Sequence, residues 1–134
     1  YVQYAHARVH SVFKAAAEAH PGLDLTDQGL AAADFSLLGD DGERELIKFL
    51  ARYPRVIEGA AREREPHRIP FYLYELASLF HSQYARGNDS PHLRFIQSGD
   101  RELTSARLAL ALAVRLVISS GLNIMGVRAP VEMR

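Results

Sequence analysis

The 134-residue sequence has no cysteine and no tryptophan, and only two of its sixteen basic residues are lysines, Lys14 and Lys48. Without cysteine the chain can form no disulfide, thiolate nucleophile, cysteine-ligated zinc site or iron–sulfur site. With two lysines there are few candidates for a lysine-based phosphate or Schiff-base site. The absence of cysteine fits a reducing compartment, and we expect a cytoplasmic protein.

The sequence also lacks a long uncharged run and a secretory signal pattern. The longest stretch without a charged residue, 116–127, is well short of the roughly 20 apolar residues that span a membrane, which predicts no membrane partner. Residues 1–10 begin in the middle of a helical pattern, so we expect a piece of a longer protein. The length and the 48% hydrophobic content predict a single globular domain over residues 1–134.

Charge is balanced overall, with sixteen basic and sixteen acidic residues, but it is unevenly distributed. Residues 1–20 and 101–134 are basic, whereas residues 21–50 carry seven carboxylates against two basic side chains. A negatively charged partner would therefore be attracted to the two ends of the chain.

Proline and glycine divide the chain into helical segments, and no segment alternates strictly enough to predict a strand. We expect an all-α helical bundle of about five to six helices. Asp40 or Asp41 and Asp100 are placed to cap helices, and Gly121 is expected to end the last one. Residues 21–39 read as a linker with a short turn at 33–38, and residues 87–99 as a polar loop. The predicted helices cover residues 1–20, 41–53, 55–65, 67–86 and 101–120.

A search for catalytic and metal-binding patterns finds no catalytic residues. Nucleotide-binding glycine motifs, the phosphate loop, the zinc-protease motif and the nucleophile elbow are all missing. His6 and His10 are four residues apart and could share a metal, but no nearby carboxylate completes the coordination, so we predict no metal site. His67 and His81 are expected to be structural, at a helix start and on a partly buried helix face.

One face of the first predicted helix is not explained by folding. At about 100° per residue the apolar side chains fall on one side, while Tyr4, Arg8, Ser11 and Lys14 share an arc of roughly 120° on the other. Two cations beside an aromatic ring suit a nucleic-acid loop, because they pair with phosphates while the ring stacks on an unpaired base. A solvated helix face is the alternative. Tyr84 is a candidate second ring, or an ordinary half-buried tyrosine.

Several segments, in order along nearly the whole chain, resemble the carboxyl-terminal domain of arginyl-tRNA synthetases. They are YVQYAHAR (1–8), ADFSLL (33–38), YPRV (53–56), EPHR (65–68), YLYELA (72–77), ARLAL (106–110), and the ending that spans residues 121–133. The resemblance implies an all-α bundle of the DALR anticodon-binding type, which binds the anticodon stem-loop of tRNA(Arg).

The resemblance also implies which residues approach the anticodon loop: Tyr4, Arg8, Lys14, Tyr84 and Met133. Three of these are the residues already singled out by helix geometry. The sequence departs from the family pattern in three places. Lys14 stands where arginine is common, Tyr84 where many relatives have tryptophan, and Arg134 follows Met133 where the family often ends.

The same family joins arginine to tRNA with ATP and magnesium, through a catalytic domain that lies upstream. Neither class I signature occurs in this sequence, so we expect a chain that binds tRNA, holds no cofactor itself and relies on the upstream catalytic domain for the reaction. Two alternatives remain at this stage. One is a helical protein-interaction domain, favoured by the neutral charge and the charged 55–65 face, and the other is a small metal enzyme using His6 and His10.

Overall fold

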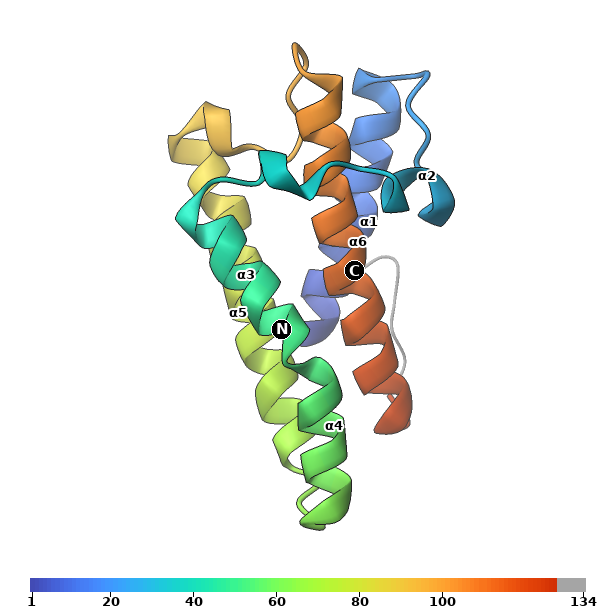
Figure 1. Cartoon of the computed structure of the whole chain (residues 1–134), viewed down its shortest axis with the longest axis vertical. Coiled ribbons are helices and arrows are strands. Elements are labelled where there is room, and N and C mark those ends of the chain that lie inside the picture. The colour runs from blue at the N-terminus through green and yellow to red at the C-terminus, as the bar shows by residue number, and fades with distance from the viewer. Residues whose placement is uncertain (128–134) are drawn as a thin grey trace.

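The computed structural model describes residues 1–127, which form six α-helices and two short 3-10 helices and contain no strand (Figure 1). This confirms the predicted all-α bundle. In chain order the elements are α1 (Val2–Ala19), α2 (Asp27–Ala31), η1 (Phe35–Leu37), α3 (Asp41–Ala51), α4 (Tyr53–Arg62), α5 (Arg68–Asp89), η2 (Pro91–Leu93) and α6 (Arg101–Ile124).

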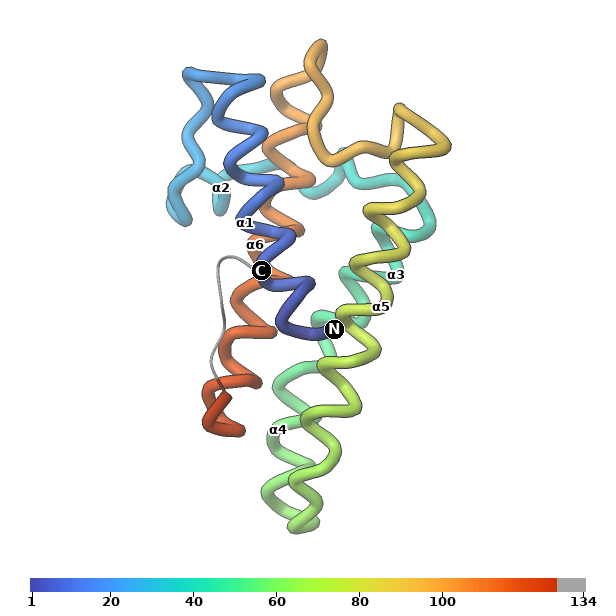
Figure 2. The backbone as a smooth tube through the Cα atoms, turned by 180° about the vertical axis from the view of Figure 1, so that it is seen from behind, coloured from blue at the N-terminus to red at the C-terminus, as the bar shows by residue number. Residues whose placement is uncertain are grey.

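The helices pack as two antiparallel pairs. α1 runs alongside α6, and α5 runs alongside the nearly continuous α3 and α4, so that α4 and the first half of α5 project beyond the start of α1 (Figures 1 and 2). α5 also packs against α1 and α6. This arrangement places the outer face of α1 beside the carboxyl-terminal half of α5.

The core is centred on α6. α6 is long and apolar enough to cross a membrane by length and composition alone, but 61% of its most apolar window is buried inside the bundle. The predicted apolar stripe of α1 faces it, with Ala5, Val9, Val12 and Ala16 fully or almost fully buried. Burying such side chains stabilises the fold by roughly 1.5–3 kcal/mol for each large one.

Two predicted caps are confirmed. The Asp40 carboxylate accepts a hydrogen bond from the Gly42 backbone N–H (3.0 Å) and begins α3, and the Asp100 carboxylate accepts from the Leu103 N–H (3.0 Å) and begins α6. Each satisfies a helix N–H that would otherwise lack a partner.

The end of α6 was predicted wrongly. The helix continues through Gly121 to Ile124, and the left-handed residue that follows it is Gly126, with φ of 74°. Gly121 instead lies against α5, where an added Cβ would be 2.7 Å from Leu73 Cδ1. The glycine therefore permits close helix packing at a position that resembles a helix stop in sequence.

Two connections also differ from the prediction. Residues 21–39 contain the short helix α2, which Thr26 caps by accepting from the Gly29 N–H (3.1 Å). The expected polar loop at 87–99 is largely structured, since α5 extends to Asp89, η2 follows, and Leu93 and Phe95 are buried. Both segments are short and rich in turn-forming residues, and tertiary packing rather than local propensity orders them.

Candidate nucleic-acid interface

The side chain of Arg8 joins the outer face of α1 to α5. Its guanidinium carbon lies 4.4 Å from the ring centroid of Tyr84 and 5.3 Å from that of Tyr4, and its Nη1 lies 3.0 Å from Nδ1 of His81. We call Tyr4, Arg8, His81 and Tyr84 the Arg8 cluster. A guanidinium over aromatic faces is held by cation–π attraction, which fixes its position while leaving it partly exposed.

The structure brings three of the five predicted site residues together. Tyr4, Arg8 and Tyr84 all belong to the Arg8 cluster, and Tyr4 keeps 48% of its surface exposed. Lys14 is exposed on α1 and makes no hydrogen bond or ion pair with any residue in the range 1–127. Met133 lies outside the described residues. The ring and the two cations are thus accessible, but only Arg8 is part of a packed cluster.

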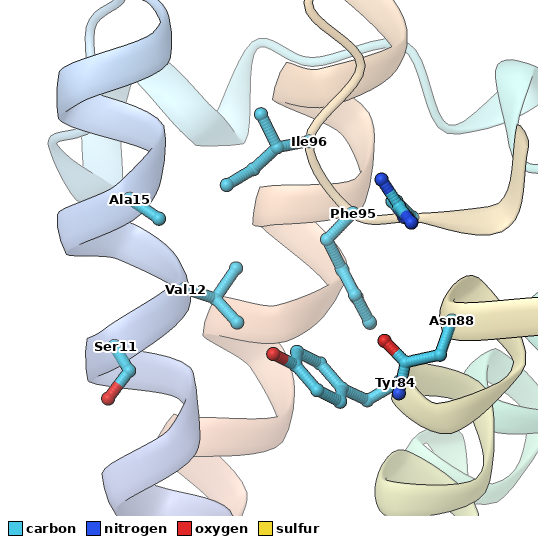
Figure 3. Close-up of a pocket in the computed structure, with 8 residues that line it drawn as sticks. Ser11, Val12, Ala15, Tyr84, Asn88, Phe95 and Ile96 are labelled. Carbon is cyan, nitrogen blue, oxygen red and sulfur yellow. The ribbon is translucent and has the colours of Figure 1, made fainter. Parts of the chain in front are cut away.

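A cavity of about 240 Å³ opens next to the Arg8 cluster. Tyr84 belongs to both, because its ring extends from α5 towards α1 and forms one side of the cavity (Figure 3). Its other face neighbour is Phe95, with ring centroids 6.4 Å apart and planes at 26°. The remaining lining residues come from α1, from the end of α5 and from the α5–α6 connection: Ser11, Val12, Ala15, Asn88, Arg94 and Ile96.

A buried ion pair holds the connection that forms one wall of this cavity. Arg107 on α6 donates from Nε to Glu43 Oε2 (3.1 Å), and its Nη1 donates to the backbone carbonyls of His92 and Arg94, each at 2.8 Å. The Arg107 and Glu43 side chains are only 7% and 2% exposed. Because the guanidinium satisfies groups on α3 and on the 92–94 segment at once, it fixes that segment relative to α6.

Sequence reasoning missed two parts of this site. His81 lies on a partly buried helix face, as predicted, but its hydrogen bond to Arg8 was not predicted. The wall formed by residues 94–96 was read as part of a polar loop. The apolar residues Leu93, Phe95 and Ile96 within that segment were a usable signal for a packed wall, whereas nothing in the sequence indicated that His81 meets Arg8, 73 positions away.

The proposed histidine pair is present but does not form a metal centre among residues 1–127. The rings of His6 and His10 lie 5.1 Å apart, and no group of three histidine, aspartate or glutamate side chains in that range is placed to hold a metal ion. Burial, followed by the nearby Arg115 charge and by His6, lowers the pKa of His10 from its ordinary value. These surroundings favour a neutral His10 imidazole.

A cluster of two rings and a cation is a feature of surfaces that bind unpaired RNA bases. A model of the DALR anticodon binding domain matches residues 2–133. The chain belongs to the DALR anticodon-binding domain family.

Curated relatives are similar over the whole chain. An arginine–tRNA ligase of Methylobacterium sp. (strain 4-46) and one of Beijerinckia indica are each 59% identical over 134 residues, and one of Rhizobium meliloti is 54% identical. The match covers 100% of this chain and 23% of each relative. The chain therefore spans about a quarter of the length of these relatives.

Proposed function

We propose that the chain binds the anticodon stem-loop of tRNA(Arg), as the anticodon-binding part of an arginine–tRNA ligase. The observation that carries this proposal is the Arg8 cluster, in which an exposed ring, a second ring and a held cation lie beside a cavity. Unpaired bases stack on such rings, and the cation pairs with a phosphate or stacks on a base. The names of the relatives supply the identity of the tRNA.

In this proposal each predicted site residue has a separate task. Tyr4 offers its exposed ring to a base, Arg8 offers its remaining guanidinium donors, and Tyr84 forms the inner side of the cavity. Lys14, exposed about three helical turns from Tyr4, would contact a phosphate further along the RNA backbone. Met133 would approach the loop from the carboxyl-terminal segment.

The placement of charge supports RNA binding despite the zero net charge. The acidic residues within 34–45 cap η1 and α3 or lie in the first turns of α3, and these two elements lie on the opposite side of the bundle from α1 (Figures 1 and 2). Several of these carboxylates are also neutralised or engaged, Glu43 by Arg107 and Asp40 by Arg86 at 2.8 Å. RNA at the outer face of α1 would therefore meet little of the acidic charge.

The full-length protein would attach arginine to tRNA(Arg) with ATP and magnesium, and would act in the cytoplasm. In that protein this domain would work by positioning: it holds the anticodon end so that the acceptor end reaches the catalytic domain, its partner in the same chain. The 134-residue chain alone would bind the stem-loop but form no arginyl-adenylate.

An NMR titration with an arginine anticodon stem-loop tests the proposal, with a stem-loop of scrambled loop sequence as control. We expect backbone amide shifts at 4–14, 81–88 and 94–96 with the cognate loop, and weaker, diffuse shifts with the scrambled one. Equal shifts with both RNAs would rule out recognition of the loop, and no shifts with either would rule out RNA binding.

A second candidate function, protein interaction, is favoured by a separate surface. A groove of about 460 Å³ between α3, α4 and α5 is lined by Arg52, Arg55 and Arg68, beside Phe71, which is 66% exposed. Arginines with an exposed aromatic ring are common at protein interfaces. If this groove were the main binding site, Phe71→Ala would abolish partner binding and Tyr4→Ala would not.

A further inference from the structure

The hydrogen bond between Arg8 and His81 fixes the protonation state of the histidine. A guanidinium carries only donors, so Nδ1 of His81 must accept the bond from Arg8 Nη1 at 3.0 Å with an unprotonated lone pair. The proton of the neutral ring then sits on Nε2, which faces the backbone carbonyl of Tyr1 at 3.5 Å. Arg8 thus requires an unprotonated Nδ1, and the Tyr1 carbonyl is satisfied by the Nε2–H of that same neutral tautomer.

The surroundings of His81 favour this neutral state. Its ring lies among the rings of Tyr1, Tyr4 and Phe80, with centroids 4.9, 5.9 and 6.0 Å away, and the charged groups that face it in the described chain are Arg8 and the α-amino group of Tyr1. Burial acts first, and the two positive groups add to it, so the pKa of His81 is below its ordinary value although the Tyr1 carbonyl opposes this.

Protonation would reverse the contact. An imidazolium carries N–H donors on both nitrogens, so Nδ1 would direct a proton and a positive charge at the guanidinium. The hydrogen bond would be lost and replaced by repulsion between two cations at short distance. Arg8 would then leave its place between the rings of Tyr4 and Tyr84.

We propose that His81 is a positioning residue for RNA binding: its neutral imidazole holds the Arg8 guanidinium between Tyr4 and Tyr84, and a proton on Nδ1 releases it. The inference rests on the proposed function, because it concerns how a residue of the RNA-binding face is placed. In this proposal His81 contributes to RNA binding without contacting the RNA itself. It also makes RNA binding sensitive to pH.

Two substitutions separate this role from a merely structural one. His81→Asn keeps a carbonyl oxygen that can accept from Arg8 but does not titrate, whereas His81→Phe keeps the ring volume and removes the acceptor. The affinity for the arginine anticodon stem-loop is measured between pH 5.5 and 7.5 at constant salt. The α-amino group of Tyr1 is acetylated or joined to a preceding peptide, so that it carries no charge beside His81.

At pH 7.5 we expect His81→Phe to bind about threefold to tenfold more weakly, the loss for one hydrogen bond, and His81→Asn to stay within about twofold of the wild type. As the pH falls, the ratio of wild-type to His81→Asn affinity should decrease. In an Arg8→Ala background, His81→Phe should cause no further loss. His67→Asn, a change of an exposed histidine outside the cluster, should have no effect.

The proposal would be overturned if the affinity losses of Arg8→Ala and His81→Phe multiplied in the double variant. Identical pH profiles of affinity for the wild type and His81→Asn would also overturn it. Nitrogen-15 NMR of the free chain gives a readout that needs no RNA. A His81 ring protonated on Nδ1 at pH 7.5 would refute the assignment and leave the proposed function standing. If the wild type fails to bind the stem-loop, both the proposed function and the role of His81 in RNA binding are wrong. This holds even where NMR finds the proton of His81 on Nε2.

Discussion

Arg8 and Lys14 carry the same charge on the same helix, yet their surroundings differ. Arg8 is half-buried between two rings and bonded to His81, so its removal would affect both binding and packing. Lys14 is exposed and projects into solvent. The two cations therefore allow electrostatic binding to be separated from placement of the cluster.

For Lys14→Ala we expect weaker RNA binding with unchanged stability. Loss of one phosphate contact should cost on the order of 1 kcal/mol and reduce the slope of log affinity against log salt by about one unit. The melting temperature should stay within error, because the side chain has no partner in the described fold. Binding isotherms at several salt concentrations test this, and an unchanged slope would show that Lys14 contacts no phosphate.

For Tyr4→Ala we expect a loss of roughly 1–3 kcal/mol in binding the stem-loop, the usual cost of removing a stacked base–ring contact. Calorimetric titration measures it. Tyr74→Ala is a matched control, because Tyr74 is 56% exposed on α5 and its ring contacts that of Tyr1, with centroids 5.0 Å apart, rather than Arg8. Similar losses in the two variants would indicate general surface disruption instead of stacking at Tyr4.

At the scale of elements, the contact between α5 and α6 depends on a glycine. We expect Gly121→Ala to destabilise the fold by about 1–3 kcal/mol, because the new methyl group would overlap the Leu73 side chain, although alanine favours helices by up to about 1 kcal/mol. Urea unfolding measures the change. Gly39→Ala, where an added Cβ meets nothing within 4 Å, should be close to neutral. A stabilised Gly121→Ala variant would show that Leu73 repacks freely.

The Arg107–Glu43 pair joins three elements. Breaking it should lower the stability of the fold more than Gly121→Ala does. Arg107→Ala would leave the Glu43 carboxylate buried without its cation and two carbonyls unpaired, at a cost of about 3–5 kcal/mol. Chemical denaturation followed by circular dichroism measures this. Arg86→Ala, which breaks the more exposed pair with Asp40, should cost about 1 kcal/mol or less. Equal losses would mean that burial adds nothing to the Arg107 pair.

Features of the fold and the site could be predicted where the interacting residues are close together in the sequence. Within one helix, angular spacing predicted the buried stripe of α1 and the exposed arc with Tyr4 and Arg8. Local chemistry predicted the Asp100 cap. Contacts across the chain were not predictable from single-sequence pattern: Gly121 resembles a helix stop unless Leu73 is known to pack on it, and His81 looks structural until Arg8 is placed beside it.

At the scale of the whole molecule, the net charge is zero, but acidic and basic side chains are unevenly distributed over the bundle. The start of α3, with its carboxylates, and α1 lie on opposite sides of the bundle (Figures 1 and 2), and two of these carboxylates, Asp40 and Glu43, are paired with arginines. Sorting of this kind lets a neutral domain attract RNA to one side. Lowering the pH therefore protonates different groups in different parts of the bundle.

The pH dependence of stability should reflect both sides. His10 and His81 have folded-state pKa values below 6.5, so the unfolded chain binds more protons between those values and 6.5, and stability falls as the pH drops through that window. Asp40 has a lowered pKa through its bonds to Arg86 and Gln83, which outweigh its burial, so stability falls again below about pH 4. Urea unfolding between pH 3 and 8 should therefore show two successive losses. The His10→Asn/His81→Asn variant should remove the upper one and keep the lower. Stability that rises on acidification from pH 7 to 5 would contradict the assignment of neutral, buried imidazoles.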